Sequence, residues 1–108
     1  MKNITDKLQS RGAQALTDEE LVAVALAENP NDDSACAMAE EVLKTAGGSL
    51  VRLAEVDFAR LRMTAGMGRM RALKLLATME LGRRVVVAEA SAQEKVLSDS
   101  DVVRIMEP

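Results

Sequence analysis

The chain has 108 residues, a formal net charge of −3 and one cysteine, and it contains no histidine. The single thiol excludes an intrachain disulfide, and the lack of histidine removes the commonest general base and metal ligand. No apolar run is long enough for a signal peptide or a membrane span, so we expect a cytoplasmic protein with no membrane partner.

Aromatic residues are almost absent, with one Phe and neither Trp nor Tyr. The core must therefore be built from Leu, Val, Ala and Met, a composition that suits packed helices better than sheets. We predict an all-α fold, a small bundle of five or six short helices. Residues 1–87 are expected to form the domain, and residues 88–108 a linker and the start of a C-terminal domain.

A first helix is predicted over residues 4–11, and Gly12 ends it. The second opens at Thr17, whose hydroxyl can cap the helix while Glu20, three residues on, reaches back to form a capping box. It ends before Asn29-Pro30.

The clearest amphipathic helix follows Ser34, its expected N-cap. Apolar residues recur at helical spacing over residues 35–46, and two glycines then end the helix. Ser49 and Asp57 are each expected to cap a further short helical turn.

A long helix is predicted from about residue 69 to residue 86. Almost all of its circumference is apolar, which is typical of a helix at the centre of a bundle. Its one polar stripe contains Arg71, Lys74 and Thr78. A last helix is expected over residues 98–106, after a polar linker.

Gly66-Met67-Gly68 stands between the turn capped by Asp57 and the long helix. Glycines allow a tight turn that other residues resist, and they leave backbone N–H groups uncovered. Those groups lie beside a helix N-terminus, where the macrodipole favours an anion. The spacing matches a helix–hairpin–helix, an element that binds nucleic-acid backbone without reading its sequence.

The predicted DNA-backbone site consists of Gly66, Met67, Gly68, Arg69, Arg71 and Lys74. Met67 is expected to point inward and hold the hairpin to the core. Residues 60–84 carry seven basic side chains and one acidic one, a net charge of +6, in a chain that is acidic elsewhere. Such polarity can orient a polyanion, and one hairpin predicts weak, salt-dependent binding.

Two other interpretations remain open. The glycines can join two helices whose arginines form a solvated face, or the domain can be a protein-interaction module that meets an acidic surface. Exposure of Arg71 and Lys74 together with the hairpin would favour DNA, whereas bordering acids from residues 28–41 would favour a protein partner. The acidic pairs in that segment and Cys36 predict neither a metal site nor a nucleophile.

Four segments together resemble the bacterial RadC-like family, a similarity that covers about residues 6–86. They are residues 6–21, residues 41–50, the Gly66-Met67-Gly68 hairpin and residues 80–84. The resemblance implies an accessory domain of a DNA repair protein, in which two hairpins are related by a pseudo-twofold axis. The first hairpin, near residues 28–34, is degenerate because its two carboxylates would repel phosphate.

Residues 96–103 resemble the lead-in to the family's second domain, a zinc-dependent JAB/MPN-type module whose metal motif needs His and Asp. Because the chain has no histidine, we expect it to have no catalytic site, metal or cofactor of its own. Its expected partners are DNA and that C-terminal domain. Docking of the C-terminal domain or of a repair partner is the alternative function.

Overall fold

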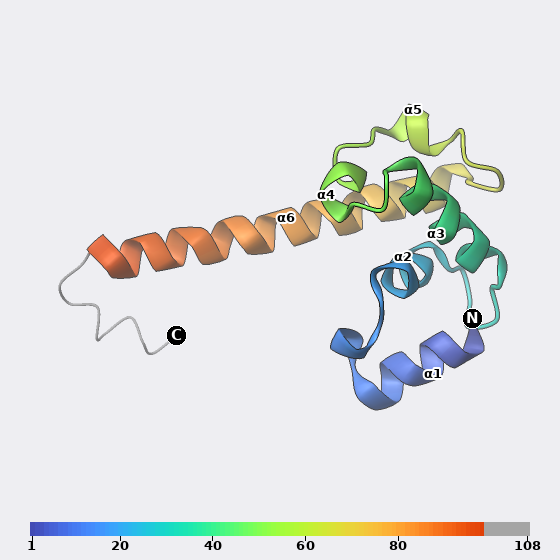
Figure 1. Ribbon diagram of the computed structural model, residues 1–108, viewed down its shortest axis with the longest axis horizontal. Helices are drawn as coiled ribbons and strands as arrows, with labels where there is room; N and C mark the ends of the chain where they lie inside the picture. The colour runs from blue at the N-terminus through green and yellow to red at the C-terminus, as the bar shows by residue number, and fades with distance from the viewer. Residues whose placement is uncertain (99–108) are drawn as a thin grey trace. The chain divides into compact units, whose positions relative to one another are not determined.

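The computed structural model describes the backbone of residues 1–98 and the side chains of residues 1–92 (Figure 1). The described elements are α1 (Lys2–Arg11), the 3-10 turn η1 (Ala13–Ala15), α2 (Asp18–Leu26), α3 (Ser34–Thr45), α4 (Leu50–Leu53), α5 (Phe58–Leu61) and α6 (Arg69–Ser98). The prediction of an all-α fold is confirmed. None of the described helices combines the length and hydropathy that a membrane crossing requires.

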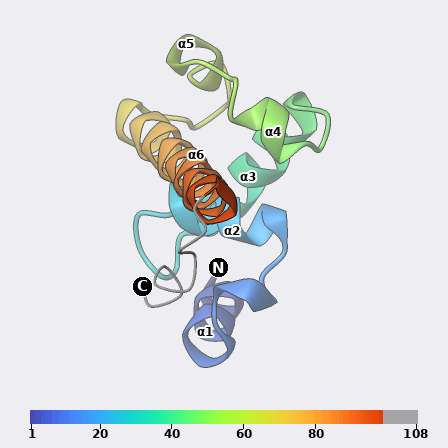
Figure 2. The same cartoon turned by 90° about the vertical axis from the view of Figure 1, so that its left-hand side faces the viewer.

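The chain comprises two units, Met1–Thr78 and the residues from Met79 onward. Helix α6 begins in the first unit and continues into the second. In the first unit, α2 and α3 pack against each other (Figure 2). Their apolar faces supply most of its buried side chains, namely Val22, Ala23, Leu26, Ala35, Met38, Ala39, Val42 and Leu43.

The predicted end of α1 and the predicted start of α2 are confirmed, but α1 begins at Lys2, two residues before the predicted start. Gly12 ends α1 with a φ of 92°, and its N–H donates to the carbonyl of Leu8. Thr17 forms the expected capping box, because its hydroxyl accepts from the N–H of Glu20 (3.2 Å) while its own N–H donates to Glu20 Oε1 (2.9 Å). Lys7 of α1 forms an ion pair with the same glutamate (2.8 Å), which joins the two helices.

The caps of the following helices agree with the sequence at two of three positions. Ser49 and Asp57 each accept a hydrogen bond from the N–H three residues on, at 3.3 and 2.8 Å. The N-cap of α3, however, is Asp33, which makes no side-chain cap, and Ser34 is the first helical residue. The hydroxyl of Ser34 donates instead to Asp32 Oδ1 in the preceding loop.

Helix α6 corrects two predictions. It continues to Ser98 instead of ending near Val86, so residues 88–97, expected as a polar linker after the helix, are part of it. This stretch has neither Gly nor Pro and is rich in strong helix formers, so nothing in it stops the helix.

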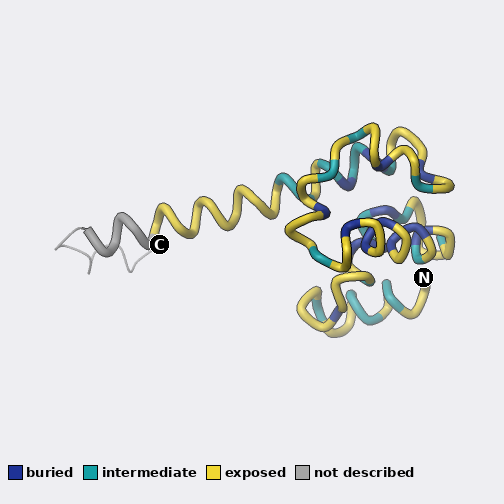
Figure 3. Tube along the Cα trace, turned by 45° about the horizontal axis from the view of Figure 1, so that its top comes forward, coloured by how far each residue is buried: buried dark blue, intermediate teal, exposed yellow. Residues whose placement is uncertain are grey.

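The prediction that α6 is a central helix is also wrong. Ala72 and Leu75 are its only fully buried residues with described side chains, and residues 81–92 are all exposed (Figure 3). The helix predicted over 98–106 falls almost wholly outside the described residues.

Candidate nucleic-acid interface

Residues 62–68 form a loop, here called the glycine loop, that joins α5 to α6. Its turn is closed by the N–H of Met67, which donates to the carbonyl of Thr64 (3.0 Å). Gly66 has a φ of 81°, a conformation that favours glycine, whereas Gly68 has no positive φ. The expectation that both glycines adopt torsions denied to other residues is therefore wrong for Gly68.

The glycine loop presents backbone to solvent while its central side chain is buried. Met67 lies in the core, as predicted, and both glycines are exposed. The carbonyl of Gly68 accepts the first hydrogen bond of α6, from Ala72 (3.1 Å). The N–H groups of the first turn of α6 therefore lack intrahelical partners, and the exposed Arg69 stands beside them.

Arg71 does not extend this exposed surface. Its Nη2 lies 2.6 Å from Asp32 Oδ2 and 3.1 Å from Glu28 Oε1, and its Nη1 lies 3.3 Å from Met38 Sδ. The Arg71 side chain is 12% exposed and that of Asp32 is 9% exposed, so the ion pair is largely shielded from water. The guanidinium thus holds the loop between α2 and α3 against the first turns of α6.

Lys74 has a similar role at the next turn of α6. Its ammonium donates to the carbonyl of Ala27 (2.8 Å), the residue that caps the C-terminal end of α2. A cation at that position satisfies an orphan carbonyl and complements the negative end of the helix dipole. Lys74 therefore neutralises a helix end within the first unit.

The Asp32 carboxylate is stabilised by its loop as well as by Arg71. The hydroxyl of Ser34, the N–H of Glu28 and the charge of Arg71, in that order of strength, hold the pKa of Asp32 below its usual value. All three favour the ionised form. The carboxylate is thus a fixed negative partner for the cation of α6.

The six residues of the predicted DNA site therefore fall into two groups. Gly66, Gly68 and Arg69 share the exposed end of α6, whereas Met67, Arg71 and Lys74 face the interior or the α2–α3 loop. Acids border both groups: Glu28 and Asp32 meet Arg71, and Glu40 and Glu41 line a hollow with Gly66. This bordering is the arrangement that favours a protein partner.

The sequence alone does not predict the pairing of Arg71 with Asp32. The two residues lie 39 positions apart and share no motif, so only the packing of α6 near the α2–α3 loop brings them together. Among the described residues, no cluster of three or more carboxylates and thiols could hold a metal ion.

Comparisons with known proteins identify relatives. A family model described as UPF0758 N-terminal matches residues 5–73. UPF0758 proteins of Streptococcus thermophilus and Porphyromonas gingivalis are each 33% identical to the chain, over 101 and 104 residues, and one of Flavobacterium johnsoniae is 31% identical over 103. These matches cover 94–95% of this chain but only 44–46% of the relatives. No solved structure matches significantly.

Proposed function

Because the chain belongs to the UPF0758 family, the RadC-like family that its sequence resembles, we propose that it is an N-terminal accessory region that docks a C-terminal domain. The chain spans less than half the length of its curated relatives, which leaves room for such a domain in the longer family members. The proposed occupant is the JAB/MPN-type domain implied by the resemblance, with residues 88–108 leading into it.

The observation that carries this proposal is the exposed second half of α6. Leu81, Val85, Ala88 and Ala92 recur at i, i+4, i+7 and i+11 and so form one stripe along the helix, here called the apolar seam. Every residue from 81 to 92 is exposed. Such a seam gains stability only by packing, because most helical stability in proteins comes from burial of an apolar face.

Charged residues beside and opposite the seam are suited to solvent. Glu80 pairs with Arg83 (2.7 Å) and Arg84 (2.8 Å), and these pairs lower the pKa of Glu80 to about 2. At 100° per residue Glu80 and Arg83 lie away from the seam, whereas Arg84 lies beside it, next to Ala88. The segment therefore carries a narrow apolar stripe suited to a partner, while Val86 and Val87 are exposed on other sides of the same helix.

Calorimetric titration of this chain with the C-terminal region of the Streptococcus thermophilus relative, made as a separate polypeptide, tests the docking. We expect binding with a negative heat-capacity change, the signature of apolar burial. Val85→Ser should weaken it by about tenfold, the loss expected for one buried valine. Val51→Ser is the matched control, since Val51 is 73% exposed on α4 and Val85 is 56% exposed on the seam.

Two results would contradict the proposal that a C-terminal domain packs on the apolar seam. One is the absence of binding, or equal binding by the two valine variants. The other is a dimer of the 108-residue chain in sedimentation analysis that Val85→Ser dissociates, because the seam would then pair with a second copy.

DNA-backbone binding at the glycine loop is the second candidate. The exposed backbone of Gly66 and Gly68, next to Arg69 and the N-terminus of α6, favours it. In this candidate Arg71 and Lys74 support the site by holding the first turns of α6 in place. With so few phosphate contacts, binding should be weak and should fall steeply as salt rises.

Fluorescence anisotropy with a labelled duplex at low salt tests this candidate. Arg69→Gln should reduce the affinity several-fold, whereas Arg11→Gln, which removes an exposed arginine at the end of α1, should not. Loss of affinity in both variants would indicate attraction by overall charge alone. No binding by the wild-type chain would end the proposal.

A further inference from the structure

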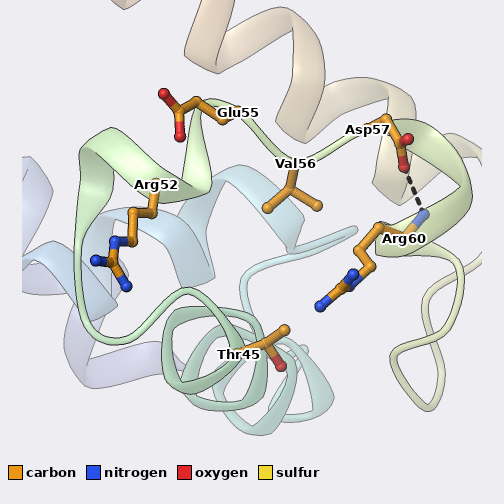
Figure 4. A pocket seen from close by; sticks show the side chains of 6 residues that line it. All are labelled: Thr45, Arg52, Glu55, Val56, Asp57 and Arg60. Carbon is orange, nitrogen blue, oxygen red and sulfur yellow. Dashed lines mark hydrogen bonds between the residues drawn. The ribbon is translucent and has the colours of Figure 1, made fainter.

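A pocket of about 220 Å³ opens where the C-terminal end of α3 meets α4 and α5 (Figure 4). Its lining residues are Thr45, Arg52, Glu55, Val56, Asp57 and Arg60. Arg52 comes from α4 and Arg60 from α5, and Figure 4 shows their side chains on different sides of the pocket, with Thr45 below. Two exposed cations from separate helices thus line one hollow.

Neither arginine is neutralised within the portion of the chain that the structure describes. Arg71, Arg83 and Arg84 all form ion pairs there, but Arg52 and Arg60 form none. Arg52 Nη1 lies 3.5 Å from the point that a Cβ at Gly47 would occupy, an ordinary contact, so the guanidinium lies beside the C-terminal end of α3.

Two other polar side chains of the pocket, Asp57 and Thr45, already have hydrogen-bond partners. The carboxylate of Asp57 accepts a hydrogen bond from the backbone N–H of Arg60 (2.8 Å) as the cap of α5. The hydroxyl of Thr45 donates to the carbonyl of Glu41 (3.0 Å). Glu55 stands at the rim and makes no ion pair with a described residue. The guanidinium groups are therefore the pocket's free hydrogen-bond donors.

We propose that this pocket binds a phosphate-class oxyanion between Arg52 and Arg60. Each guanidinium presents a fork of donors that matches two oxygens of a phosphate. A tetrahedral anion offers oxygens in several directions and so can meet two forks from different sides, whereas a planar carboxylate presents two oxygens along one edge. The carboxylates of Glu55 and Asp57, which also line the pocket, oppose the anion and limit its affinity.

The anion has two possible sources, free phosphate and the backbone of a nucleic acid. A second hollow shares Thr45 and Arg60 with the pocket and extends to Thr64 and Ala65 of the glycine loop. A polyanion held at the glycine loop would therefore pass Arg60. The pocket does not depend on the apolar seam of α6, so Val85→Ser should leave anion binding unchanged.

Nuclear magnetic resonance of the arginine Nε–H groups in the full chain, titrated with inorganic phosphate, tests the site. Sodium chloride at equal ionic strength and acetate serve as parallel titrations. Phosphate should shift Arg52 and Arg60 together and in a saturable way. Arg52→Gln and Arg60→Gln should each weaken binding by about tenfold, the loss expected for a charge-assisted hydrogen bond. Arg11→Gln should not change it.

Glu55→Gln should have the opposite effect on phosphate affinity, because removing this carboxylate should tighten phosphate binding several-fold. A DNA duplex at equal phosphate concentration identifies the source: tighter binding than inorganic phosphate, lost in Arg60→Gln, assigns the site to nucleic-acid backbone. Saturable shifts with inorganic phosphate alone assign it to a free phosphate. Shifts no larger than those with chloride, or equal binding by both glutamine variants and the wild type, would overturn the proposal.

Discussion

Arg71 in α6 and Asp32 in the α2–α3 loop form an ion pair, with Nη2 and Oδ2 2.6 Å apart. Arg71, which the sequence suggested as a DNA contact, therefore connects two segments of the first unit. Met38 Sδ accepts from the same guanidinium, so α3 is connected as well. The Nε of Arg71 is buried without a partner, which shows how far the guanidinium is enclosed.

We expect Arg71→Gln to lower the melting temperature of the chain by several degrees. The substitution leaves the Asp32 carboxylate without its cation in a site that is 9% exposed, and unpaired buried charges are costly. Arg69→Gln removes an exposed arginine without an ion pair among the described residues and should leave the melting temperature unchanged. Thermal denaturation followed by circular dichroism measures both. Equal melting temperatures would show that the ion pair contributes nothing.

The same ion pair predicts a pH dependence. The folded protein lowers the pKa of Asp32, so the carboxylate stabilises the fold above its ordinary pKa of 3.8, and this contribution is lost as pH falls through the folded-state value. Asp32→Asn should therefore be less stable than wild type at pH 7, and the difference should shrink below about pH 4. Urea denaturation at pH 7 and at pH 3 measures the difference. A difference that is constant with pH would contradict the assignment.

Gly66→Ala should destabilise the chain by about 1 kcal/mol, the cost of a left-handed conformation for a residue with a Cβ. The φ of 81° alone causes this cost, because the added Cβ would lie 3.6 Å from Met38 Sδ, an ordinary contact. Gly82→Ala should instead stabilise the chain, since Gly82 lies inside α6 with open space around it and alanine is the better helix former. Chemical denaturation and helical ellipticity measure the two effects.

Glu80→Gln should reduce the helicity of α6, because it removes the ion pairs with Arg83 and Arg84 at i+3 and i+4. In the wild type this contribution is complete above pH 4.5 and disappears as pH falls through about 2. Glu89→Gln is the control, since Glu89 has no ion pair among the described residues. Ellipticity at 222 nm between pH 7 and pH 2 measures the effect, and identical curves for the two variants would contradict it.

Local features are predictable to the extent that their causes are local. The Thr17–Glu20 capping box, the caps at Ser49 and Asp57 and the end of α1 at Gly12 each depend on residues within one turn. The end of α6 lies later than predicted, because the polar composition after Val86 is typical of a linker but does not stop a helix. Helix formation depends on propensity and on the absence of a stop signal, and both favour continuation to Ser98.

The sequence by itself determined the family, the all-α class and the local ends of most helices, because motifs and caps act over a few residues. Only the tertiary structure decided which cations remain free. The spacing of Arg71 and Lys74 along α6 would be the same whether their side chains faced solvent or the α2–α3 loop. Their partners lie 39 and 47 positions away. Such pairings depend on how helices pack, and no pattern within a single helix contains that information.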